Sequence, residues 1–132
     1  MSRTIKFEIM LEAKEPGEHG YNVGEHVKIV NEIFDRQNGV AFWEIDSAFE
    51  IIWRRQFTGL HLNQKEIYEG DVFLIDDEHI LVYWDTEKAS FQIKNDYHKK
   101  GRSLSQSWLE TNDIELIGNI YEDESLKEKV NL

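Results

Sequence analysis

Acidic side chains at residues 76–78 and the adjoining His79 form the densest cluster of candidate metal ligands in the chain. Carboxylate oxygens bind hard cations such as Ca²⁺ and Mg²⁺, so a cation site is one interpretation of Asp76-Asp77-Glu78-His79. The other interpretation is a tight turn exposed to water, because the cluster separates two apolar runs and aspartate favours turns. We favour the exposed turn and predict no metal ligand in this segment.

The histidines are spaced too widely to predict a zinc site, because no two of them lie two or four positions apart and no HExxH motif is present. They are His19, His26, His61, His79 and His98. The sequence contains no cysteine, which removes thiolate ligands and thiol nucleophiles. No GxSxG motif and no phosphate-binding glycine loop appear either. We therefore predict a non-enzymatic protein with no catalytic residue, no metal ligand and no cofactor-binding residue.

The segment Lys94–Arg102 is locally basic and also contains Tyr97 and His98. Cations interleaved with aromatic rings can bind single-stranded nucleic acid, particularly with Trp84 or Trp108 nearby. The net charge of −11 opposes binding to a phosphate backbone. We therefore favour a charged loop over a nucleic-acid site, and nucleic acid is an unfavoured partner.

Composition indicates one folded domain, or one small domain with an extension. The chain has 132 residues, 40% of them hydrophobic, and a single proline, which argues against extensive disorder. The first fifteen residues lack an apolar core of signal-peptide length, and no run approaches the ~20 apolar residues of a membrane span. We expect a cytoplasmic protein with no membrane partner.

Alternating apolar residues separated by turn residues predict a succession of short strands. The expected strands are 5–11, 25–30, 40–45, 49–57, 71–76, 79–84, 89–94 and 114–120, and residues 103–109 are expected to return apolar side chains to the core. Arg55 interrupts the apolar face of 49–57, which predicts an edge or a partly exposed end. Gly118 within the last strand predicts a bulge, and Ser125 is a candidate cap for a short helix over 122–129.

The segment Phe57–Phe73 contains two glycines that we expect to set chain reversals. Glycine enters the left-handed backbone region at low cost, and aspartate accepts hydrogen bonds from nearby amides. Gly59 and Gly70 therefore predict turns on either side of a short loop, with Gly70 at positive φ before the strand that begins at Asp71. Both glycines are expected to serve the backbone alone.

About five short, locally connected strands from Phe49 to Ile120 predict a mainly β fold built on a small SH3-like barrel. The expected organisation is an N-terminal β-containing extension over 1–50, the barrel over 51–121, and a C-terminal tail or short helix over 122–132. Four tryptophans accompany these strands, and we expect them to pack in the core rather than to form a base-stacking platform. They are Trp43, Trp53, Trp84 and Trp108.

Three motifs in this order resemble the signature of the YopX family of phage and prophage proteins: TGL at 58–60, IYEGD at 67–71 and IGNIYE at 117–122. The resemblance covers about Trp53 to Tyr121 well and the first fifty residues poorly. Family members carry an Asp-Lys-Asn-Gly-Lys type of turn after TGL, whereas this chain has His61-Leu62-Asn63-Gln64-Lys65, without glycine. Asn63 can adopt the left-handed conformation that such a turn needs.

The resemblance implies a largely β fold with an SH3-like barrel, a phage or prophage origin, and self-assembly as a homo-oligomer. It implies no reaction, so no catalytic residue is transferred. Our functional hypothesis is a phage-encoded protein that acts through protein–protein contacts in the bacterial host. The alternative is a nucleic-acid binding protein or an acidic mimic of nucleic acid. The C-terminal region from Glu110, with seven acids and two lysines, would suit a basic host protein or serve solubility.

Overall fold

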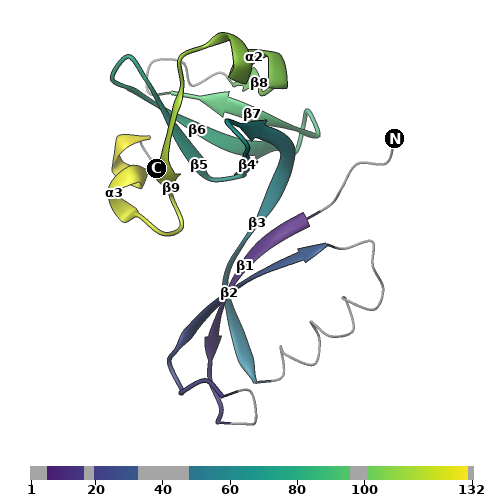
Figure 1. Cartoon of the computed structure of the whole chain (residues 1–132), viewed down its shortest axis with the longest axis vertical. Coiled ribbons are helices and arrows are strands. Elements are labelled where there is room, and N and C mark those ends of the chain that lie inside the picture. The colour runs from purple at the N-terminus through teal and green to yellow at the C-terminus, as the bar shows by residue number, and fades with distance from the viewer. Residues whose placement is uncertain (1–5, 17–19, 33–47, 96–100, 131–132) are drawn as a thin grey trace. The chain divides into compact units, whose positions relative to one another are not determined.

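The computed structural model describes residues 6–16, 20–32, 48–95 and 101–130, so the strand expected at 40–45 and most of the basic segment lie outside the described residues. The fold is mainly β, with two antiparallel sheets, one of which curls into a half-barrel, and two short helices near the C-terminus (Figure 1). The chain divides between Phe57 and Thr58 into unit 1 and unit 2, which we describe separately. No described helix has the length and apolar character needed to cross a bilayer.

Unit 1 is built on strand β1, Lys6–Ala13, which pairs antiparallel with β2, His26–Glu32, and with the first part of β3, Phe49–Leu62. Side chains of a strand alternate between the two faces of its sheet, so the odd positions of β1 share one face. Ile9, Leu11 and Ala13 are buried there and pack with Phe49 of β3, as the apolar alternation predicts.

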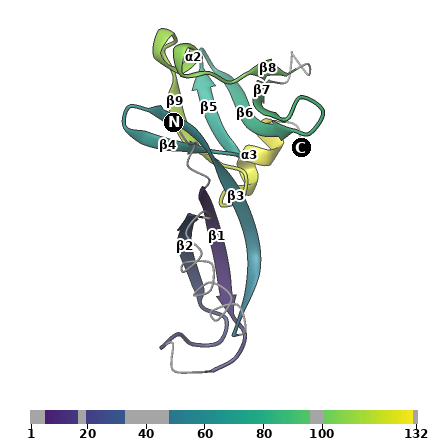
Figure 2. The ribbon, with the colours of Figure 1, turned by 90° about the vertical axis from the view of Figure 1, so that its right-hand side faces the viewer.

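Unit 2 contains the end of β3, the remaining strands and both helices. These elements are β4 Lys65–Tyr68, β5 Asp71–Ile75, β6 Glu78–Asp85, β7 Ser90–Lys94, β8 Arg102–Ser103, α2 Gln106–Thr111, β9 Glu115–Asn119 and α3 Glu124–Lys129. The five-stranded sheet has the order β8-β7-β6-β5-β9, which can be followed in Figure 2. Its core includes the fully buried Ile67, Phe73, Val82 and Leu109.

Two tight reversals in unit 2 confirm sequence predictions about turns. Asn63 and Gln64, between β3 and β4, have φ of 51° and 70°, so the turn survives without glycine. Asp76 and Asp77, between β5 and β6, have φ of 46° and 69°. Two consecutive residues at positive φ are typical of type I′ hairpin turns, which match the twist of paired strands.

The bulge predicted at Gly118 is also confirmed. The register of β5 against β9 shifts between Val72 and Phe73, opposite Gly118 and Leu116. Gly118 has φ of +151°, at the margin of the region that favours glycine. One residue of β9 is therefore left without a direct partner across the pair, as in a β-bulge.

Four sequence predictions about the chain after Phe49 were wrong. Seven strands, β3 to β9, occupy the segment for which about five were expected. The turn expected at Gly59 is absent, because β3 runs through this residue from Phe49 to Leu62. Residues 106–111 form helix α2, which the sequence did not predict, although Leu109 reaches the core as expected. The first turn of α2 is capped by the Ser105 hydroxyl, which accepts a hydrogen bond from the Trp108 amide. Helix α3 is capped by Asp123 and not by Ser125, because the Asp123 carboxylate accepts from the Ser125 amide at 3.0 Å. Aspartate is among the strongest N-cap residues.

Candidate functional site

Gly70 occupies the turn before β5 with φ of +87°, as predicted from the sequence. Its amide donates to the Val82 carbonyl at 2.8 Å, and its carbonyl accepts from the Ile120 amide at 3.0 Å. A Cβ at this position would overlap the ring of Tyr121. The turn thus needs glycine for its backbone conformation and also for the close approach of an aromatic ring.

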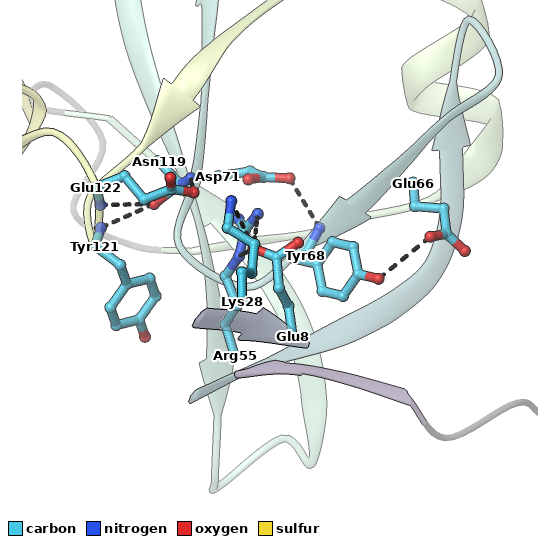
Figure 3. Close-up of polar contacts among 9 residues, drawn as sticks. All are labelled: Glu8, Lys28, Arg55, Glu66, Tyr68, Asp71, Asn119, Tyr121 and Glu122. Carbon is cyan, nitrogen blue, oxygen red and sulfur yellow. Dashed lines mark hydrogen bonds and ion pairs between the residues drawn. The ribbon is translucent and has the colours of Figure 1, made fainter. Parts of the chain in front are cut away.

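The polar side chains beside this turn bind backbone groups (Figure 3). Asp71, only 3% exposed, accepts a hydrogen bond from the Tyr68 amide at 2.8 Å. The buried Thr58 hydroxyl donates to the Ile67 carbonyl at 2.7 Å and accepts from the Leu60 amide at 3.1 Å. Buried backbone groups must find partners, and here these two side chains supply them.

The Asn119 side chain likewise hydrogen-bonds backbone groups, at the end of β9. Its side-chain oxygen accepts from the amides of Tyr121 and Glu122 at 3.0 and 2.9 Å, and its side-chain nitrogen donates to Glu122 Oε1 at 3.1 Å (Figure 3). Asn119 also lies directly opposite Asp71 in the sheet. The motifs TGL, IYEGD and IGNIYE therefore meet around the Gly70 turn, and the contacts above use their polar atoms to fix the backbone. We call these three motifs, together with the hydrogen bonds just described, the signature framework.

Unit 1 contains a buried ion pair that the sequence did not predict. Arg55 was expected at an edge or a partly exposed end, and this was wrong, because its residue is 6% exposed. Its Nε and Nη2 lie 3.0 and 2.9 Å from Glu8 Oε1, and Lys28 Nζ lies 3.9 Å from the same oxygen. The strand register places Glu8 directly opposite Arg55 (the pair is drawn in Figure 3). Opposite charges at facing positions stabilise a strand pair.

A second charged group on unit 1 is exposed. Glu12 contacts Lys14 and lies 3.2 Å from His26 Nε2, while Lys14 Nζ lies 3.1 Å from Glu50. The hydrogen bond from Lys14, and then that with His26, lower the pKa of Glu12. The hydrogen bonds to Glu12 and Glu50 raise the pKa of Lys14. These shifts favour the charged forms of both groups, which keeps the pairs intact near neutral pH.

The acid cluster at residues 76–79 forms the β5–β6 turn and the start of β6. Asp76, Asp77 and Glu78 are exposed, and the Glu78 carboxylate accepts a hydrogen bond from Asn95 at 3.0 Å. Among the described residues, no three His, Asp or Glu side chains are placed to hold a metal ion together. His26, His61 and His79 belong to different strands, and His19 and His98 lie outside the described residues.

The prediction that the tryptophans pack in the core is confirmed for Trp108 and wrong for Trp84, while Trp43 lies outside the described residues. Trp108 of α2 packs on the core beside Phe73, with ring centroids 6.0 Å apart. Trp84 is 36% exposed and meets the ring of Phe91 edge-on at 4.9 Å. In the basic segment, Lys94 Nζ lies 4.7 Å from the centroid of the Tyr83 ring. Burial, and then the nearby Asp85, raise the pKa of that tyrosine.

A groove of about 720 Å³ lies between the β3–β4 hairpin and the segment from α2 to residue 114. The buried apolar residues in its lining are Leu62, Leu109 and Ile114. The exposed polar residues in its lining include Asn63, Gln64, Glu110, Asn112 and Asp113. The Gln106 side-chain amide donates to the His61 carbonyl at 2.7 Å and accepts from the His61 amide at 3.0 Å. Sequence reasoning missed the groove because it did not predict α2.

Comparison with known proteins supports the resemblance drawn from the three motifs. No curated protein matches the chain. The family described as YopX protein matches residues 9–128, nearly the whole chain and well beyond the motifs themselves. On this match, and with its signature residues assembled around one turn, the chain belongs to the YopX family.

Proposed function

We propose that this protein is a non-enzymatic phage or prophage protein that acts through protein–protein contacts in the cytoplasm of its bacterial host. The partner is a host or phage protein, or a second copy of the chain. The observation that carries the proposal is the unequal distribution of exposed apolar side chains. Six large ones are exposed among the described residues, and five belong to unit 1: Tyr21, Val23, Val30, Ile51 and Ile52.

Such side chains are favourable contact points because burying them against a partner removes apolar surface from water. Val30 is 55% exposed and Ile52 is 45% exposed. Val30 lies on β2, which is the terminal strand among the described strands of its sheet, in the order β2-β1-β3-β4. A terminal strand offers backbone groups to which a partner strand can pair. Unit 1 therefore offers both apolar contacts and a strand edge.

We further propose that the strands of unit 2 form an SH3-like barrel. The support is a meander of three consecutive antiparallel strands, β5, β6 and β7, with β9 added beside β5. The β3–β4 hairpin contributes Leu62 and Ile67 to the same core as Phe73 and Val82. Folds of this kind host many unrelated functions, so the contact function rests on the exposed residues of unit 1 and not on this architecture.

Photo-crosslinking tests the contact proposal. The full chain, carrying a benzophenone amino acid at position 52, is produced in a bacterial host and irradiated. We expect a discrete protein adduct, and none when the group is placed at the exposed Glu87 of unit 2. Adding Ile51→Asp should lower the adduct yield about fivefold, the effect of losing roughly 1 kcal/mol of contact energy. An adduct of twice the chain mass would identify a second copy as the partner.

The proposal fails if position 52 gives no adduct and the purified chain is strictly monomeric by light scattering. It also fails if positions 52 and 87 give the same adducts with equal yield, because the contact would then be nonspecific.

A further inference from the structure

We infer that the groove between the β3–β4 hairpin and α2 binds a basic peptide segment of the partner protein, with a lysine or arginine side chain in the groove. This inference rests on the proposed contact function and specifies the chemistry of the partner. It concerns unit 2, whereas the exposed apolar residues above belong to unit 1.

The charge of the groove selects a cation. Among the described residues, its lining contains the carboxylates of Glu110 and Asp113 and no lysine or arginine. Within the described part of the chain, the Asp113 side chain makes no hydrogen bond or ion pair, and Glu110 receives only one hydrogen bond, from Gln106 Nε2 at 3.3 Å. Both carboxylates are exposed and can take a charged donor from a partner. The net charge of −11 attracts a basic partner over a longer range and disfavours a second acidic copy in this groove.

The apolar part of the groove suits a long basic side chain better than a small cation. Leu62, Leu109 and Ile114 also line the groove, and their exposed fractions of 7%, 1% and 8% leave a small apolar area for a side-chain stem. Lysine and arginine bury their methylene stems on apolar surface while the charged end remains near water and acids. Side-chain amides of Asn63 and Gln64 on the hairpin can both donate and accept, so they can hydrogen-bond a peptide backbone.

The two walls of the groove are tied to each other before any ligand arrives. The paired hydrogen bonds between Gln106 and the backbone of His61 attach α2 to β3. The left-handed Asn63 and Gln64 fix the hairpin tip. A preformed site loses less entropy when it binds, which favours a short peptide as ligand.

A titration followed by amide NMR signals tests the inference. The probe is the peptide acetyl-Lys-Leu-Lys-Leu-Lys-amide, added to the full chain at an ionic strength of about 0.15 M, where charges more than about 8 Å apart are largely screened. We expect the largest signal changes at Gln64, Leu109 and Ile114, and a dissociation constant about tenfold higher for the double variant E110Q/D113N. That factor corresponds to roughly 1.4 kcal/mol, in the range of two exposed ion pairs.

The matched control is E87Q/E128Q, which removes the same charge from exposed acids of unit 2 that do not line the groove. Its dissociation constant should stay within about twofold of the wild-type value, because distant exposed charges are screened. Equal weakening in both double variants would overturn the inference. It would also be overturned if signal changes spread over all acidic surfaces, or if spermidine produced the same changes at the same concentration.

This outcome is separable from the test of the contact function. An adduct at position 52 together with no peptide binding in the groove would remove the inference and leave the proposed function standing. Peptide binding in the groove without any adduct would support the inference about the ligand and locate the contact in unit 2 instead of unit 1.

Discussion

Replacing Gly70 by valine is expected to lower the free energy of unfolding of unit 2 by about 3–5 kcal/mol. A β-branched residue at φ of +87° is strained by roughly 1–3 kcal/mol. The new side chain would also overlap the Tyr121 ring and crowd Ile120, whose nearest side-chain carbon is 3.4 Å from an ideal Cβ, and overpacking costs about 1–3 kcal/mol more. Urea unfolding followed by tryptophan fluorescence, with the NMR signals of unit 2 as a second probe, measures the loss.

Two variants separate the causes of this loss. Gly24 has φ of +91°, and no atom of the described residues lies within 4 Å of an ideal Cβ, so Gly24→Val reports backbone strain, and we expect about 1–2 kcal/mol. Tyr121→Ala removes the ring, so Gly70→Val should cost less in that background than in the wild-type chain. The explanation is contradicted if Gly70→Val is as stable as wild type, or if its cost is the same with and without the Tyr121 ring.

Replacing Arg55 by methionine is expected to cost about 3 kcal/mol. Methionine keeps a long apolar stem but removes both contacts to Glu8, a carboxylate that is only 12% exposed. Removing one partner of a buried ion pair typically costs about 3–5 kcal/mol because the remaining charge is left in a poorly hydrated site. Lys28, whose Nζ is 3.9 Å from the same Glu8 oxygen, offsets part of the loss. Unit 1 signals followed through urea unfolding provide the measurement.

Arg54 supplies a matched control for this variant. It is exposed and pairs opposite Ile9, with its guanidinium 5.2 Å from the centroid of the Phe7 ring. Arg54→Met should cost less than about 1 kcal/mol, because cation–π contacts at exposed sites are weak. The double variant Glu8→Met/Arg55→Met should recover most of the stability lost in Arg55→Met, because it leaves neither charge of the buried pair without its partner, and Lys28 is exposed to water. Equal costs at positions 54 and 55 would refute the role assigned to the buried pair.

Residue-type preferences predicted the backbone conformation wherever a few neighbouring residues determine it. The positive φ of Gly70, the left-handed Asn63 and the bulge at Gly118 each follow from residue type and immediate neighbours. The apolar alternation of β1 likewise predicts its buried face. In such cases the conformational preference of a few residues determines the geometry, so the sequence alone predicts it.

Prediction failed where distant segments decide the environment. Arg55 is buried because the β1–β3 register places it opposite Glu8, 47 positions earlier in the sequence. Helix α2 has only six residues, so its composition carries little signal, and tertiary contacts such as those of Leu109 and Trp108 stabilise it. The groove depends on α2 and on the Gln106–His61 hydrogen bonds, and it was therefore invisible in the sequence.

The hydrogen bonds and the close approach at Gly70 explain what several residues of the three motifs do in the fold. Thr58, Asp71 and Asn119 bind backbone groups within unit 2, and Gly70 admits the Tyr121 ring. Residues with such roles maintain the fold, so we look for the proposed partner contacts outside the signature framework. In this chain we assign them to the exposed apolar residues of unit 1 and the acidic groove of unit 2.

Amide hydrogen exchange tests the signature framework most directly. The amides of Leu60, Tyr68, Gly70 and Ile120 are bound to Thr58, Asp71, Val82 and Gly70. If these contacts form one cooperative framework, all four amides should exchange only through global unfolding of unit 2, with a common free energy that falls in Gly70→Val. Exchange of these amides as fast as that of the exposed β6–β7 turn, or with unrelated free energies, would contradict the account.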